Sequence, residues 1–151
     1  MTSKDVLNNN IRVISEYLPD IYSVSLGLWV GVGSACEQAK ESGISHYIEH
    51  MLFKGTKKRT AKQIAETLES VGGQMNAFTA KEHTCYYAKC LNEDFDLALE
   101  LFEDMYHNSL FDAAETEREK GVILEEINMY DDSPEDLVHD VFAEKLWGIH
   151  P

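Results

Sequence analysis

The sequence predicts an α+β domain in which helices pack on one face of a largely antiparallel sheet. Two strand-like segments open the chain, two helical segments follow, and a second strand pair precedes three further helical segments. Strands and helices therefore do not alternate one by one, as they would in a parallel βαβ fold. The 151 residues are enough to enclose one hydrophobic core.

The first pair of strands is expected at residues 11–18 and 22–31, which are rich in β-branched and aromatic side chains. Pro19 and Asp20 mark the turn between them. In the second segment every other residue is apolar, from Val24 to Val30. This alternation predicts a strand with one buried face.

Helix signals and turn residues set the bounds of the remaining elements. A helix is expected at about 43–53, and Thr60 with Gln63 resembles a capping box for a second helix that ends before Gly72. Strands are expected at 74–80 and 83–91, and helices at 93–107 and 113–130. A last helix is expected to begin with Ser133 as N-cap and Pro134 as its first residue, and to end near Trp147.

Composition narrows the choice of partners. The net charge is −14, from 13 basic and 27 acidic residues, so nucleic acid is a poor partner and a basic peptide a better one, although solubility alone also explains this charge. No segment approaches the ~20 apolar residues of a membrane span, and the N-terminus lacks a secretory signal. The three cysteines match no metal-binding spacing and are expected to be reduced. We therefore expect a cytoplasmic chain without membrane partners.

The residues that carry chemistry lie in the first helical segment, as His46, Glu49 and His50. Residues four apart on a helix lie ~5–6 Å from each other, so both imidazoles can bind one Zn²⁺. Glu49 shares this face and can reach a water on the same metal. Phe53 falls there too, where it could contact substrate or cap the site. The simpler interpretation is a polar helix face with two histidines four apart by chance.

The opposite side of this helix is expected to pack on the sheet. At about 100° per residue its apolar residues cluster on that side. They are Ile44, Tyr47, Ile48, Met51 and Leu52.

A catalytic zinc site needs a third protein ligand and keeps one open position. Glu119 and Glu126 lie seven residues apart in the segment 113–130, so they share one helix face with Ile123. Glu125 is rotated by about 100° toward solvent. A carboxylate that points inward needs a charged partner or a metal. The residues leave Glu119 and Glu126 as alternative ligands, and ordinary acidic helix surface fits them as well.

With the HxxEH motif and a distant glutamate, the chain resembles the inverzincin peptidases, which include pitrilysin, insulysin and the catalytic subunit of mitochondrial processing peptidase. The likeness is greatest to the bacterial processing-protease branch and covers nearly the whole chain. Several long segments in order are more specific than one short motif. They are residues 23–37, 43–56, 72–87, 117–136 and 147–151.

This resemblance implies the roles of individual residues. Glu126 matches the third zinc ligand, and Glu119 matches an acidic residue that orients a histidine ligand. Glu49 would serve as general base and then acid in zinc-assisted hydrolysis of a peptide bond. The substrate would add as an edge strand beside Asn76 and Ala77, which without the resemblance belong to an ordinary strand.

Known members of the family are considerably longer and contain paired homologous domains. We therefore expect residues 1–151 to be the N-terminal part of the zinc-binding domain, an incomplete first domain with little activity of its own. The partner would be a second homologous domain or subunit. The function implied is a zinc endopeptidase acting on peptides or unfolded, presequence-like segments. The alternative is a non-catalytic homologue with a structural or partner-binding role, although such relatives typically lose motif residues. A purely structural zinc site is disfavoured by Glu49 and the open position.

Overall fold

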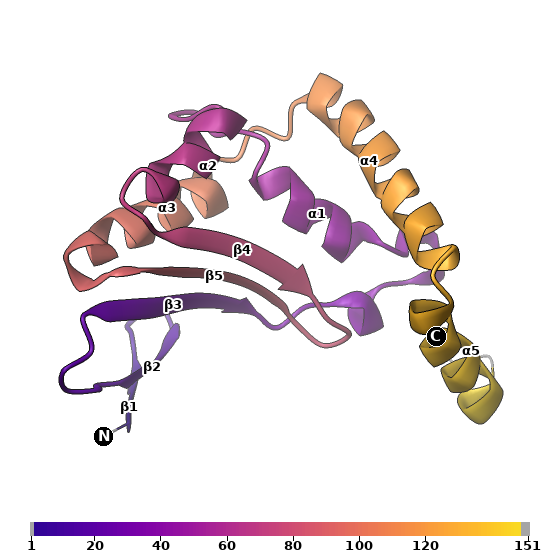
Figure 1. The fold of residues 1–151 in the computed structure, drawn as a ribbon, viewed down its shortest axis with the longest axis horizontal. Helices are drawn as coiled ribbons and strands as arrows, with labels where there is room; N and C mark the ends of the chain where they lie inside the picture. The colour runs from indigo at the N-terminus through magenta and orange to yellow at the C-terminus, as the bar shows by residue number, and fades with distance from the viewer. Residues whose placement is uncertain (1, 149–151) are drawn as a thin grey trace.

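A three-stranded antiparallel sheet organises the computed structural model, which describes residues 2–148 (Figure 1). Its order is β3 (Ser23–Val30), β5 (Thr84–Leu91) and β4 (Gln74–Thr79), so β5 is central and β4 lies at an edge. Along β3 half-buried and exposed residues alternate from Val24 to Val30, as the sequence predicts. Residues 149–151, the end of the matching segment 147–151, lie outside the described residues.

The N-terminal segment forms a separate hairpin, and this corrects the sequence-based prediction. β2 (Arg12–Glu16) pairs with β1 (Thr2–Val6) rather than with β3. Every residue of the two hairpin strands is exposed. The polar segment that forms β1 carries no apolar alternation, so its pairing could not be recognised from local pattern.

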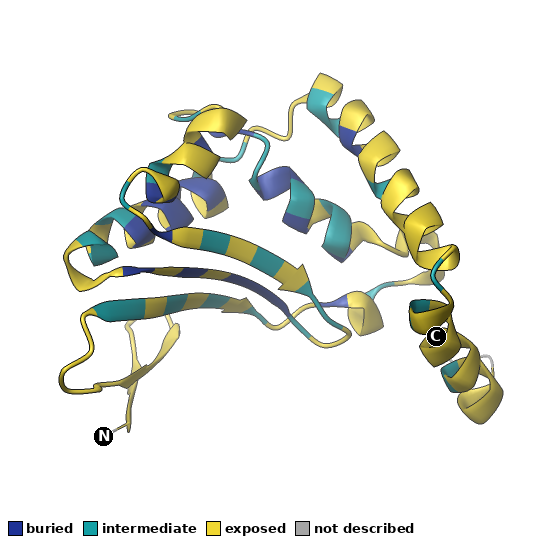
Figure 2. Cartoon of the chain, in the orientation of Figure 1, coloured by how far each residue is buried: buried dark blue, intermediate teal, exposed yellow. Residues whose placement is uncertain are grey.

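Three helices cover one face of the sheet, which confirms the expected α+β architecture (Figure 1). They are α1 (Ile44–Leu52), α2 (Ala61–Glu69) and α3 (Phe95–Asn108), and three short 3₁₀ turns lie at Ser34–Cys36, Ala39–Glu41 and Asn92–Asp94. The buried apolar core lies between this face and the helices (Figure 2). Its residues are Leu52, Ile64, Leu68, Tyr86, Ala88, Cys90, Ala98, Leu101, Phe102 and Met105.

Two further helices complete the described chain. α4 (Ala113–Asp131) passes alongside α1, and α5 (Pro134–Trp147) extends beyond the sheet (Figure 1). Most of their residues are exposed (Figure 2). Ser133 occupies the N-cap of α5 with Pro134 after it, but its side chain makes no capping hydrogen bond. Within residues 2–148 no helix combines the length and the apolar character that crossing a membrane requires.

Candidate metal centre

The N-terminus of α1 is held by a carboxylate from outside the helix. Glu37 accepts hydrogen bonds from the backbone N–H groups of Gly43 and Ser45, both at 2.7 Å. Burial works to raise the pKa of Glu37, but these hydrogen bonds outweigh it and lower the pKa. The first amides of a helix have no partner within the helix, so Glu37 satisfies them and anchors the helix that carries the histidines.

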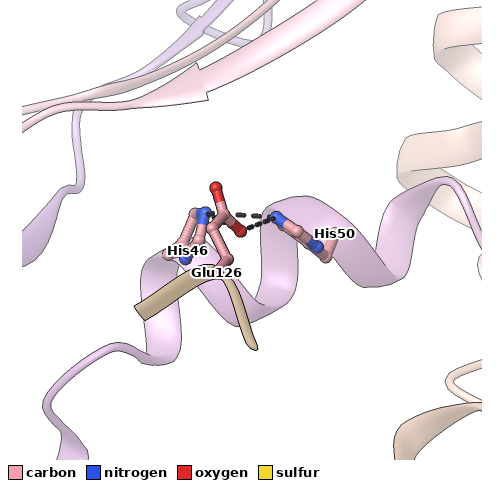
Figure 3. Close-up of side chains that lie close together, drawn as sticks. All are labelled: His46, His50 and Glu126. Carbon is pink, nitrogen blue, oxygen red and sulfur yellow. Dashed lines mark hydrogen bonds and ion pairs between the residues drawn. The ribbon is translucent and has the colours of Figure 1, made fainter. Parts of the chain in front are cut away.

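Two histidines of α1 and one glutamate of α4 point toward a common space (Figure 3). The Nε2 atoms of His46 and His50 are 3.1 Å apart. The Oε2 atom of Glu126 lies 3.8 Å from Nε2 of His46 and 3.5 Å from Nε2 of His50. In a tetrahedral zinc site with ligands at ~2.0–2.1 Å, neighbouring donor atoms are about 3.3 Å apart. These three side chains therefore fit a zinc ion in both donor type and spacing.

A second glutamate of α4 orients one of the histidines. Oε1 of Glu119 lies 2.8 Å from Nδ1 of His50, and Oε2 lies 2.6 Å from the ammonium of Lys54. Burial works to raise the pKa of Glu119, but the hydrogen bonds from Lys54 and His50 outweigh it and lower the pKa. An ionised Glu119 accepts a hydrogen bond from Nδ1–H of His50, and this leaves the Nε2 lone pair of His50 facing Glu126.

Sequence reasoning missed Lys54, although a signal for it was present. Lys54 lies four residues after His50, so a helix that continues for one more turn brings both side chains to the same side. Because Glu119 is only 3% exposed, its charge needs a cation nearby. Lys54 supplies that cation from the turn after α1.

Glu49 lies on the sheet side of α1, which corrects the predicted helix faces. It is 7% exposed, and its Oε2 accepts a hydrogen bond from the Thr79 hydroxyl of β4 at 2.5 Å. Met51 and Leu52 are buried as expected, but Ile44 and Ile48 are exposed. β4 and α4 both flank α1, so Glu49 contacts the sheet while His46 and His50 face Glu126 of α4.

Tyr47, expected to face the sheet, instead contacts α4. Its hydroxyl donates a hydrogen bond to the backbone carbonyl of Thr116 at 3.1 Å. This contact joins the two helices that supply the donor atoms.

Phe53 packs against the hydrophobic core. It stands at the C-cap of α1, and its ring packs against the core, 6.3 Å from the ring of Tyr86. Contact with a substrate and capping of the site both stay predictions for Phe53.

Asn76 and Ala77 lie on the edge strand β4. The side-chain oxygen of Asn76 accepts a hydrogen bond from the backbone N–H of Ala77 at 2.8 Å. The N–H of Ala77 is thus not engaged with β5 and faces the free edge of the sheet.

Fold and site together define an α+β domain with a candidate metal site, and comparison with known proteins shows the family to which it belongs. The family model described as insulinase, peptidase family M16, matches residues 12–151. The chain belongs to this peptidase family.

Individual relatives and solved structures support the assignment. The chain is 46% identical over 150 residues to the uncharacterized zinc protease YmxG of Bacillus subtilis, covering 99% of this chain and 37% of the relative. It is 49% identical to an uncharacterized zinc protease of Mycobacterium leprae, covering 98% of this chain and 33% of the relative. The chain thus spans about a third of the length of these relatives.

Among solved structures, a protease from Helicobacter pylori superposes with a TM-score of 0.86 at 29% identity, over 91% of this chain and 33% of that one. The periplasmic protease PqqL from Escherichia coli superposes with a TM-score of 0.85 at 25% identity, over 95% of this chain and 17% of that one. The α+β fold is therefore that of known proteases.

Proposed function

We propose that the protein containing this chain is a zinc-dependent endopeptidase that hydrolyses peptides or unfolded, presequence-like segments. The observation that carries the proposal is the convergence of His46, His50 and Glu126, with donor separations near those of a tetrahedral zinc site, on a domain whose helix α1 also carries the buried carboxylate of Glu49. A structural zinc site would not need a further carboxylate at this place.

Each side chain has a separate task in the proposed reaction. His46, His50 and Glu126 would hold the ion, and Glu119 keeps the ring of His50 oriented. A bound Zn²⁺ would supply a Lewis acid that polarises the substrate carbonyl and lowers the pKa of water toward ~7. The carboxylate of Glu49 accepts a proton from the attacking water and then returns this proton to the leaving amine.

The free edge of β4 supports binding of an extended peptide. A peptide that adds as a further strand would pair with the backbone of β4. The N–H of Ala77 is one donor at this edge. Its present acceptor is the side-chain oxygen of Asn76, which a carbonyl of the bound peptide would have to replace. The net charge of −14 favours peptides that carry basic residues.

A second homologous domain or subunit is part of the proposal. Large apolar side chains on α4 and α5 are exposed, including Met129, Phe142 and Trp147. Exposed apolar area of this kind marks a surface that another part of a protein covers. Residues 1–151 by themselves are expected to show little peptidase activity, and robust chelator-sensitive turnover by this segment would contradict that expectation.

The test uses the full-length protein and pairs metal analysis with a peptide-cleavage assay. Glu49→Gln is expected to lower kcat by about 10²–10⁴-fold because the proton acceptor is lost, while zinc stays bound. Glu126→Gln is expected to lose zinc. The matched control is Glu125→Gln, an exposed neighbour that should retain both zinc and cleavage.

Two results would change the proposal. Cleavage that survives Glu49→Gln would remove the catalytic assignment and favour a non-catalytic role within the family. Unchanged zinc content in Glu126→Gln would return the role of third ligand to Glu119.

A further inference from the structure

The carboxylate of Glu49 is connected to the sheet through a hydroxyl. Thr79, the last residue of β4, donates its hydroxyl proton to Oε2 of Glu49 at 2.5 Å. Within residues 2–148 this is the one side-chain hydrogen bond to Glu49. A buried carboxylate that lacks a donor is strongly destabilised, so this contact determines where the carboxylate rests.

The hydrogen bonds of Thr84 explain why the hydroxyl of Thr79 donates to Glu49 and not to Thr84. Thr84 of β5 stands opposite Thr79 in the strand register, and the two hydroxyl oxygens are 3.4 Å apart. The Thr84 hydroxyl donates to the backbone carbonyl of Val32 at 3.0 Å. Each hydroxyl has one proton, so the proton of Thr84 is engaged and that of Thr79 is directed at Glu49.

The two oxygens of the Glu49 carboxylate therefore differ. Oε2 is bound to Thr79, and no hydrogen bond to Oε1 is found in the described part of the chain. Every buried side-chain nitrogen or oxygen there has a partner, so Oε1 remains accessible to water. One oxygen is held by the protein while the other can accept a proton.

Thr79 is well suited to hold a carboxylate in place. Its β-branched side chain has restricted rotation, and it sits on a strand paired with the central strand β5. Glu49 has a longer side chain with several rotatable bonds, which it would otherwise sample. The sheet thus restrains the carboxylate of Glu49 through Thr79.

We propose that Thr79 is a positioning residue that fixes the Glu49 carboxylate for proton transfer, with Oε1 as the oxygen that takes the proton. This inference rests on the proposed function, because it gives Thr79 a role only if Glu49 is the general base. Correct placement of a catalytic group within about 1 Å can change the rate about 10²-fold.

The test compares Thr79→Val and Thr79→Ser in the full-length protein. Valine keeps the shape and removes the donor, so kcat should fall about 10–100-fold while KM and zinc content stay within about twofold. Serine keeps the donor and should restore most of kcat. Thr84→Val leaves the hydrogen bond from Thr79 to Glu49 intact and should lower kcat less than Thr79→Val does.

A double-mutant cycle with Glu49→Gln separates positioning from a general structural effect. If Thr79 acts through Glu49, Thr79→Val should change the residual turnover of Glu49→Gln by less than about twofold. Thr79→Ala serves the same purpose if the valine variant does not fold, because alanine takes less space.

Several outcomes would overturn the inference. They are a kcat of Thr79→Val or Thr79→Ala within about twofold of wild type, a serine variant as impaired as valine, or equal losses with and without Glu49. If Glu49→Gln itself remains fully active, the proposed function fails. If Glu49→Gln is inactive while Thr79→Val is fully active, only the role of Thr79 fails.

Discussion

The chain contains two regions that differ in how they are packed, here called the body and the arm. The body is the sheet β3–β5–β4 with α1, α2 and α3, and the arm is α4 with α5. Among residues 2–148 the buried apolar side chains all lie in the body, between Met51 and Met105. In the described part of the arm only Glu119 is buried, and Met129 is 73% exposed.

The proposed metal centre lies where the body and the arm meet. The body supplies two imidazoles, and the arm supplies Glu126, whose side chain is 49% exposed. Stability should therefore depend mainly on side chains of the body, and metal affinity on a few contacts with the arm. Substitutions in the body, in the arm and at their junction should therefore change different properties of the protein.

The largest effect on stability is expected for Asp104→Asn in the body. Asp104 is 1% exposed and accepts hydrogen bonds from Thr56, Arg59 and Asn108 at 2.7, 2.8 and 2.9 Å. Removing its charge leaves Arg59 with an incomplete partner, so the free energy of unfolding should fall by about 3 kcal/mol. Chemical denaturation measures this loss, with the exposed Glu103→Gln as control, and zinc affinity should not change.

The same residue predicts a pH dependence. Burial works to raise the pKa of Asp104, but hydrogen bonds from Thr56, Arg59 and Asn108 outweigh it and lower the pKa. The stabilisation is therefore complete above the unfolded pKa of ~3.9 and is lost as the pH falls through the folded pKa. Asp104→Asn should flatten the loss of stability in acid. An acid slope equal to that of wild type would contradict this account.

At the junction of the two regions, Glu119→Gln should weaken zinc binding by about 10–100-fold. The amide carries no charge, so it holds the Nδ1 proton of His50 less strongly and leaves Lys54 without its carboxylate. Competition with a chelator measures the affinity. The control is Glu117→Gln on the exposed side of α4, and an affinity for Glu119→Gln equal to that of the control would exclude the orienting role.

The smallest effects compare one helix cap from each region. Thr60 and Gln63 form a complete capping box at α2 in the body, so Thr60→Ala should lower the free energy of unfolding by about 1 kcal/mol. Ser133 makes no side-chain capping bond at α5 in the arm, so Ser133→Ala should change it by only a few tenths. Thermal unfolding of both variants measures the two losses of stability. Equal losses would show that the capping hydrogen bond of Thr60 does not stabilise the protein.

Local patterns predicted the elements that contain their own signals. The capping box of α2 and the alternation along β3 are both present in the structure. The hairpin strand β1 and the outward direction of Ile44 and Ile48 were not predicted. A strand without apolar alternation shows no pattern, and helix periodicity does not reveal how many neighbours will flank a helix.

The residues of the site show the same division. Spacing along a single helix placed His46 beside His50, and Glu119 in line with Glu126, because helix geometry depends on near neighbours. The packing of α4 against α1 decides the roles of the two glutamates. It brings Glu119 to Nδ1 of His50, 69 residues away in the sequence, and Glu126 to the Nε2 atoms of both histidines. The hydrogen bond from Thr79 to Glu49 likewise requires the packing of α1 on β4, because contacts between distant segments arise from packing and not from the local period of the chain.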